Sequence, residues 1–279
     1  MQLPKVSIII PCYNQGHYLN EALSNLEPRN NDYEVIIIND GSTDKITISE
    51  LELCTHKGFQ VINQVNKGLA EARNIGIEKS TGDFIMLLDA DNCVQLDFIY
   101  NALNVFESDT NVAVVYSDAL YFGQKKGRWV VGEFNLQKLM IDNYIDACAM
   151  VRKNVFTQLG GYDSKMKEIK SGWEDWEMWL RISFSGKKFV YLPEIGFKYR
   201  VHKESMIGEI KNNYQVRNML NEYIHNKYPA QIGHQHISNF VLKRFKPHPV
   251  HFLVKLVLMA WFTKHYNQLL SKNKIIRGI

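Results

Sequence analysis

The apolar run Phe84–Leu88 constrains the fold of this chain most, because it ends abruptly in two acidic residues, Asp89 and Asp91. Five consecutive apolar residues between turn-forming residues predict a strand that is buried on both faces of a sheet. In an open α/β sheet, ligands bind at the carboxyl ends of the strands. We therefore expect the two carboxylates at the ligand-binding edge of a mainly parallel sheet.

Asp89 and Asp91 have the spacing of two side chains that point the same way from an extended backbone. Paired oxygen ligands with no Cys or His beside them suit Mg²⁺ or Mn²⁺ holding a diphosphate. The alternative is a polar loop after a strand, in which Asp91 caps the next helix. A motif this short leaves that alternative open.

Strand and helix patterns alternate along the first ninety residues, which predicts βαβ units and a parallel sheet. The expected strands are Val6–Ile10, Tyr33–Asn39, Phe59–Asn63 and Phe84–Leu88, and the expected helices are His17–Leu26, Thr47–His56 and Leu69–Lys79. Further helices are expected at Leu96–Glu107, Leu136–Asn143, Lys153–Leu159 and Glu174–Ser185, and strands at Val112–Ser117, Ile145–Val151, Lys188–Leu192 and Phe197–Tyr199. A hairpin is expected over 119–132 and a polar loop over 162–172.

The pattern turns helical after about residue 209, so we expect one α/β domain at 1–209 and a helical region at 210–279. Composition is that of a globular protein, with 46% hydrophobic and 22% charged residues. A net charge of +4 does not indicate a nucleic-acid partner. Four scattered cysteines fit a reducing cytoplasm, and no apolar stretch reaches the ~18 residues of a membrane span.

Polar residues follow three of the expected parallel strands, so their side chains should meet at one sheet edge. Tyr13 offers a ring on which a planar base can stack, and Asp40 can accept a hydrogen bond from an imide N–H such as that of uracil. Arg73 can contact a diphosphate or the base. Each has a plainer interpretation, namely a loop aromatic, a turn residue and a surface charge. Their joint placement favours a ligand site.

Four motifs together resemble those of family 2 glycosyltransferases with the GT-A fold. They are Val6–Asn14, Ile38–Asp44, Asn66-Lys67-Gly68 with Ala72–Gly76, and Leu88–Asp91. The resemblance covers roughly residues 5–205. It implies a GT-A (Rossmann-like) α/β fold, with a mixed, mainly parallel sheet flanked by helices and a C-terminal helical extension. It also implies a nucleotide-sugar donor, usually UDP-linked, a divalent metal (Mn²⁺ or Mg²⁺) and inversion at the anomeric carbon.

The resemblance also implies roles for individual residues. Asp40 binds the base imide, Asp91 is the main metal ligand, and Asp89 lies beside the ribose and the metal. The other implied donor-site residues are Pro11, Tyr13, Asn14, Lys67, Arg73 and Ala90. His202, in the sequence Tyr199-Arg200-Val201-His202, is a candidate third metal ligand or diphosphate contact, and the alternative is a structural histidine.

A second acidic motif, Glu174-Asp175 at an expected helix start, matches the position of the general base in this family. Inverting transfer needs one base to take the proton of the acceptor hydroxyl. Ser171-x-x-Glu174 is also a capping box, which explains Glu174 better than Asp175. We therefore expect Asp175 to be the base and Glu174 to cap the helix or contact the acceptor. Trp173 and Trp176 are candidates for an acceptor-stacking floor, whereas Trp179 fits the core.

The expected function is inverting transfer of a sugar from a UDP-sugar to a hydroxyl of a glycan or lipid-linked acceptor, in bacterial surface polysaccharide or glycoconjugate synthesis. The chain should be cytoplasmic, with a peripheral membrane position as an alternative. The basic and apolar tail 239–266 suits a membrane surface, a second copy of the chain or packing on the catalytic domain. A nucleotidyltransferase is disfavoured because no Gly-rich loop follows the first strand. A catalytically silent nucleotide-sugar-binding subunit remains the other alternative.

Overall fold

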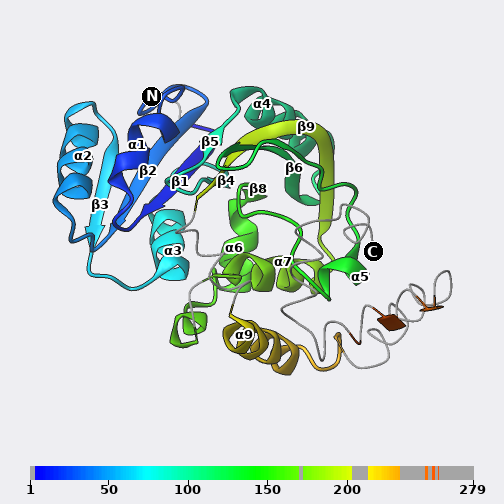
Figure 1. Cartoon of the computed structure of the whole chain (residues 1–279). Coiled ribbons are helices and arrows are strands. Elements are labelled where there is room, and N and C mark those ends of the chain that lie inside the picture. Colours follow the sequence, from blue (N-terminus) through cyan, green and yellow to red (C-terminus); the bar gives the residue numbers. More distant parts are fainter. Residues whose placement is uncertain are drawn as a thin grey trace. The chain divides into compact units, whose positions relative to one another are not determined.

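The computed structural model describes residues 4–169, 172–202 and 213–232, together with 249–250, 253–254 and 257 (Figure 1). The chain divides into two compact units, Met1–Ile224 and His225–Ile279. The domain boundary expected near residue 210 falls in 203–212, outside the described residues, so that division stays a prediction. Among the residues that are described, no helix is long and apolar enough to cross a membrane.

The first unit is built on a nine-stranded sheet with the order β3-β2-β1-β4-β8-β6-β9-β5, and β7 pairs with β6. Strands β1 (Val6–Cys12), β2 (Tyr33–Asp40), β3 (Gln60–Gln64) and β4 (Phe84–Leu87) are parallel to one another. All seven residues of β1 are buried, as expected for a strand covered on both faces. The predicted parallel sheet is therefore confirmed, and the three polar strand ends share one edge.

Helices α1 (Gly16–Ala22), α2 (Lys45–His56) and α3 (Leu69–Lys79) connect these strands. Helix α3 lies so close to β1 that a Cβ at Gly76 would stand 2.3 Å from Cγ2 of Ile9. Only glycine permits this approach. The close packing of α3 on the sheet holds Arg73, one turn earlier, near the carboxyl ends of the strands.

Further strands of the sheet, and the helices between and after them, follow β4 along the chain. They are β5 (Cys93–Val94), α4 (Leu96–Ser108), β6 (Val112–Gly123), β7 (Gly127–Trp129), α5 (Leu136–Leu139), β8 (Met150–Arg152), α6 (Lys153–Leu159), the 3₁₀ helix η1 (Ser164–Glu168), α7 (Glu174–Phe184), β9 (Lys188–Val201) and α9 (Tyr214–Lys227). Strands β6 and β7 form the predicted hairpin. Of the expected C-terminal helices, α9 is described, and the greater part of the others lies outside the described residues.

The two strands expected at Lys188–Leu192 and Phe197–Tyr199 are one strand, β9, which runs parallel to β6 (Figure 1). The register shifts between them, because Ser117 pairs with Leu192 while Asp118 pairs with Ile195. The two extra residues in β9 include Pro193, which cannot donate to a ladder and suits a bulge. The bulge made one strand look like two in the sequence.

Candidate active site

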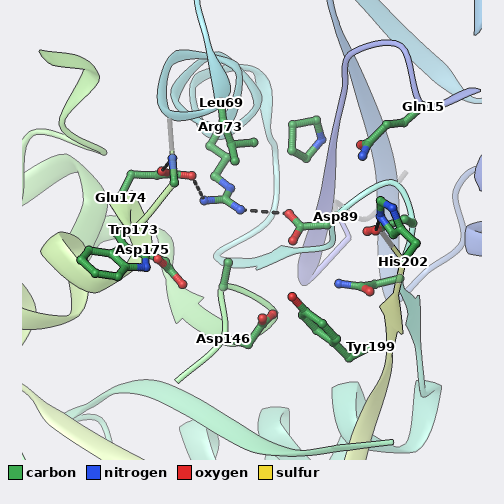
Figure 2. Close-up of a pocket in the computed structure, with 15 residues that line it drawn as sticks. Gln15, Leu69, Arg73, Asp89, Asp146, Trp173, Glu174, Asp175, Tyr199 and His202 are labelled. Carbon is green, nitrogen blue, oxygen red and sulfur yellow. Dashed lines mark hydrogen bonds and ion pairs between the residues drawn. The ribbon is translucent and has the colours of Figure 1, made fainter. Parts of the chain in front are cut away.

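Two adjoining cavities open at the carboxyl ends of the parallel strands. The first, of about 460 Å³, lies beside β1 and β2 and is lined by Tyr13 and Asp40; we call it the β1–β2 cavity. The second, of about 110 Å³, shares Pro11, Gln15 and Leu69 with the first. We call it the acidic cavity because its lining includes Asp89, Asp91, Asp146, Glu174 and Asp175, together with Arg73 and His202 (Figure 2).

Arg73 lies at the centre of the acidic cavity and is only 2% exposed. Its Nη2 is 2.9 Å from Oδ1 of Asp89, and its Nη1 is 2.9 Å from Oε1 of Glu174 (Figure 2). The second Glu174 oxygen accepts a hydrogen bond from the Gly172 N–H. Burial acts to lower the pKa of the guanidinium, but the charges of Asp89 and Glu174 outweigh it and raise that pKa, so Arg73 stays charged. The ion pairs join the start of α7 to the end of β4.

The interpretation of Arg73 as a solvated surface charge is therefore wrong, because helix α3 packs on the sheet and buries it. Its Nε is also buried, and no described residue forms a hydrogen bond with it. A buried donor without a partner costs free energy, which a hydrogen bond to a bound ligand would recover. An anionic ligand at the carboxyl end of β4 would satisfy it.

Replacing Arg73 with Met should destabilise the fold, because it leaves Asp89 and the buried Glu174 without their shared cation. Removal of one partner of a buried ion pair costs about 3–5 kcal/mol. We expect a loss of this size in the free energy of unfolding, measured by urea denaturation. Lys5→Met, which removes an exposed pair with Glu107, is the control and should leave the midpoint almost unchanged. Equal effects of the two variants would contradict the central position of Arg73.

Asp175 occupies the start of α7 on one wall of the acidic cavity (Figure 2). Its Oδ2 accepts a hydrogen bond from Asn143 Nδ2 at 2.8 Å, and its Oδ1 accepts one from the Trp176 N–H at 2.8 Å. Burial, followed by the charge of Glu174, raises the pKa of Asp175 to about 7, and Arg73 opposes the shift. A fixed carboxyl group with this pKa is suited to accept a proton near neutral pH.

The local structure around Glu174 differs from the expected capping box. The residue that precedes the helix is Trp173, in the left-handed conformation with φ 70°, and it makes no side-chain cap. Ser171 lies outside the described residues. Glu174 is 2% exposed and its oxygens bind Arg73 and Gly172, so it connects α3 to the start of α7.

Trp176 does not form the expected acceptor floor, because its side chain is fully buried and its Nε1 donates to the carbonyl of Leu139. Trp179 is also fully buried, which confirms its predicted place in the core. Trp173 packs edge-on against Trp176 and lines the acidic cavity. Of the two candidate acceptor residues, only Trp173 reaches the site.

The backbone at Asp89 and Asp91 is a turn and not the expected extended segment, since the Asn92 N–H donates to the Asp89 carbonyl. The two carboxylates therefore find different partners. Asp89 pairs with Arg73, whereas Oδ2 of Asp91 lies 3.0 Å from Nε2 of His202. Burial and the Asp89 charge raise the pKa of Asp91.

Of the three expected metal ligands, Asp89, Asp91 and His202, the last two lie in contact with each other. No group of three or more His, Cys, Asp or Glu that could hold a metal ion occurs among the residues described. The carboxylate and the imidazole nevertheless supply oxygen and nitrogen donors side by side, and the buried Nδ1 of His202 has no hydrogen-bond partner among the described residues. This donor pair fits a divalent cation whose remaining positions are taken by water and ligand oxygens.

In the β1–β2 cavity, Asp40 is 4% exposed and its oxygens already bind protein donors. Oδ1 accepts hydrogen bonds from Gln64 Nε2 and the Lys67 N–H, and Oδ2 accepts one from the Gly68 N–H. A carboxylate has about four acceptor sites, so one remains for a base N–H. Tyr13 is 46% exposed at the rim, where its ring is free to stack.

Three residues expected to bind the donor do not line either cavity: Asn14, Lys67 and Ala90. Asn14 instead ties the loops after β1 and β2 together, since its Oδ1 accepts from the backbone of Thr43 and Asp44. Lys67 contributes its backbone N–H to Asp40 while its side chain is exposed. Ala90 is buried in the turn. These three residues therefore support the loops around the site and do not line the cavities themselves.

The sequence pattern did not indicate Asp146 or Asn143, because it predicts a helix that ends at Asn143 and a strand at Ile145–Val151, where the structure has a loop and then the short β8. Asn143 Oδ1 accepts from the Ile145 N–H, and Asp146 Oδ1 accepts from the Cys148 N–H. Two Asx turns in succession are a loop signal that was present in the sequence. Burial and the charges of Asp89 and Asp175 raise the pKa of Asp146 well above its usual range.

Helix η1 also has an unexpected position. The Lys167 and Ile169 side chains line the β1–β2 cavity, and Lys167 Nζ lies 3.4 Å from the carbonyl of Asn66. The segment expected as a loop thus borders the same cavity as Tyr13 and Asp40.

The family model described as Glycosyl transferase family 2 matches residues 7–160. A curated relative, an uncharacterized glycosyltransferase of Haemophilus influenzae, is 26% identical over 189 residues, which are 63% of this chain and 61% of the relative. The chain thus matches less than two thirds of that relative's length.

Two solved structures share the fold. Staphylococcus aureus TarS 1-349 in complex with UDP-GlcNAc has a TM-score of 0.62 at 15% identity, over 91% of this chain and 81% of that one. The mannosyltransferase PcManGT of Pyrobaculum calidifontis, in complex with GDP-Man and Mn²⁺, has a TM-score of 0.56 at 17% identity, over 97% and 84%. The sheet flanked by helices is the GT-A fold.

Proposed function

Since this chain belongs to glycosyl transferase family 2, we propose that it is an inverting glycosyltransferase that transfers a sugar from a UDP-sugar to a hydroxyl group. The observation that carries the proposal is the arrangement of the acidic cavity. A carboxyl group with a pKa of about 7, Asp175, shares this cavity with Arg73 and with the Asp91–His202 pair. One cavity thus holds a base that can deprotonate the acceptor hydroxyl and the groups that can stabilise the charge of the leaving diphosphate.

The donor nucleoside occupies the β1–β2 cavity in this proposal. Its base stacks on Tyr13 and donates its imide N–H to Asp40. The diphosphate extends into the acidic cavity, where Arg73 directs its unpartnered Nε–H toward a phosphate oxygen. The UDP-GlcNAc and GDP-Man complexes of the structural neighbours support a nucleotide-sugar donor.

A divalent cation, Mn²⁺ or Mg²⁺, fits Asp91 and His202 with Asp89 nearby, and when bound it supplies positive charge to the leaving diphosphate. The Mn²⁺ complex of PcManGT supports this choice of ion. Arg73 contributes a second, permanent charge on the same side. Glu174 is a positioning residue, because it fixes Arg73 and does not touch the reacting atoms.

Asp175 accepts the proton of the acceptor hydroxyl as its oxygen attacks the anomeric carbon. The bond from that carbon to the diphosphate oxygen breaks in the same displacement, and its electron pair leaves with the nucleotide. A single displacement inverts the anomeric configuration. Asn143 holds the Asp175 carboxylate in place, and Trp173 borders the space for the acceptor.

The pH dependence of transfer should report Asp175. The carboxyl group acts as a base only when it is ionised, and its pKa is raised to about 7. We expect log(kcat/KM) to rise with unit slope below about pH 7 and to be level above it. Initial rates of nucleotide release between pH 5 and 9 test this, and a profile that falls as pH increases to 7 would contradict it.

The acceptor is proposed to be a glycan or lipid-linked sugar in bacterial surface polysaccharide or glycoconjugate synthesis, with the reaction in the cytoplasm. The tail 239–266, proposed to contact a membrane, the catalytic domain or a second copy, lies mostly outside the described residues. Those partners stay predictions.

The proposal is tested by incubating the protein with Mn²⁺ and a panel of UDP-sugars, with GDP-mannose included, and measuring the released nucleotide. We expect release from one donor or a small set of donors, faster when glycan acceptors are added. No release from any donor, in the presence of nucleotide binding, would favour the silent binding subunit.

A further inference from the structure

Asp146 is an acidic group of the acidic cavity that the proposed reaction does not use. It lies in the loop between α5 and β8, on the wall opposite Arg73 and between Asp175 and Tyr199 (Figure 2). The loop is held on both sides of Asp146. Before it, Asn143 donates to Asp175 and the Ile145 carbonyl accepts a hydrogen bond from Trp179 Nε1, and after it the Cys148 N–H donates to Asp146 Oδ1. Asp146 therefore has a set position relative to the base.

The position of the donor sugar follows from the groups at either end of the cavity. Its anomeric carbon must lie between the leaving diphosphate, beside Arg73 and Asp91, and the hydroxyl that Asp175 deprotonates. Asp146 lies close enough to both Asp89 and Asp175 to be influenced by both charges. The sugar ring must therefore pass the wall that Asp146 and Ala147 form.

We propose that Asp146 binds a hydroxyl group of the donor sugar and selects neutral sugars over uronic acids. The inference rests on the proposed function. Asp146 lines the cavity, and its Oδ1 accepts the Cys148 N–H, whereas no hydrogen bond from the described residues reaches its Oδ2. Sugar hydroxyls are donors as well as acceptors, so they pair with this oxygen. The contact selects the sugar and does not depend on the nucleotide.

The pairing of the basic side chains in this part of the cavity is the reason to expect that a uronic acid is rejected. The basic side chains of the described lining are Arg73 and His202. Arg73 binds Asp89 and Glu174, and His202 binds Asp91. A sugar carboxylate beside Asp146 and Asp175 would be removed from water while both basic side chains of the lining are already paired with acids and the proposed metal is engaged by the diphosphate, which is strongly unfavourable.

The test compares donors that differ only in the oxidation of C6. They are UDP-glucose with UDP-glucuronic acid, and UDP-galactose with UDP-galacturonic acid. For the wild-type protein we expect kcat/KM, from released UDP, to be about 100-fold or more higher for the neutral member of an accepted pair. Asp146→Asn and Asp146→Ser should lower this ratio about tenfold, mainly by lowering kcat/KM for the neutral sugar.

Two controls separate sugar recognition from general damage. Asp97→Asn, an exposed acid in the first turn of α4, should keep the wild-type ratio. The affinity of each Asp146 variant for UDP alone, measured by calorimetry, should stay within about twofold of wild type, because the nucleotide does not contact Asp146. The thermal midpoint of each variant shows that it is folded.

The outcomes distinguish this inference from the proposed function. If the wild-type protein releases nucleotide from no donor, the proposed function fails. If it uses neutral and uronic sugars equally well, or if folded Asp146 variants keep the wild-type ratio, the inference is overturned while the function stands. If kcat/KM of Asp146→Asn no longer decreased below pH 7, Asp146 would be the general base in place of Asp175. That result would also overturn the inference.

Discussion

Asp175→Asn is expected to lower kcat by about 10³-fold, because the variant has no group that can take the acceptor proton. Its affinity for UDP and for the donor should change little, since Asp175 lies at the start of α7 and does not border the β1–β2 cavity. Single-turnover transfer with the preferred donor, together with calorimetry of UDP binding, measures the two effects. Asp97→Asn is the matched control. Wild-type-like transfer by Asp175→Asn would remove Asp175 from the mechanism.

The same variant should not lose stability. The pKa of Asp175 is raised in the folded protein to about 7, from an ordinary value near 4. A raised carboxyl pKa means that the folded state holds the proton more tightly, so stability is greatest at low pH and falls as pH rises to about 7. At pH 8 the wild type has lost up to about 4 kcal/mol from this group, and the neutral amide avoids that loss. The thermal midpoint of Asp175→Asn at pH 8 should therefore equal or exceed that of the wild type.

Asp91→Asn is expected to lower kcat/KM by about 10³-fold, because an amide replaces the carboxylate proposed to hold a divalent cation beside the leaving group. The wild type treated with EDTA should fall to the level of the variant, and added Mn²⁺ should restore the wild type only. Mn²⁺ binding followed by electron paramagnetic resonance gives a readout apart from activity. A wild type that is indifferent to EDTA, or a fully active Asp91→Asn, would contradict this role of Asp91.

The sheet edge that carries the site was predictable because its determinants are local. Each parallel strand is a short run of consecutive apolar residues, and each run ends at a polar residue or a turn. Helix α3 has the predicted bounds, Leu69–Lys79, since its ends are marked by Gly68 and Ser80. Once these elements are known, the parallel arrangement alone brings Asp40 and Asp89 to one edge.

The pairing of Arg73 was not predictable, because Glu174 is 101 residues away and only the folded chain brings them together. The error at Trp176 has a different cause. Trp176 and Trp179 lie three residues apart on one helical face, and this face packs into the core, so an acceptor site and a buried stripe have the same periodicity. At β9, the bulge at Pro193 hid the continuity of one strand.

The inverting displacement with Asp175 as base is the central claim, and the anomer of the released sugar tests it most directly. In the absence of an acceptor, water takes the place of the acceptor hydroxyl. Proton NMR of the first minutes of hydrolysis of an α-linked UDP-sugar resolves the anomers before mutarotation mixes them. We predict that the β-anomer appears first, and that Asp175→Asn releases almost no sugar. Initial release of the α-anomer would contradict the single displacement.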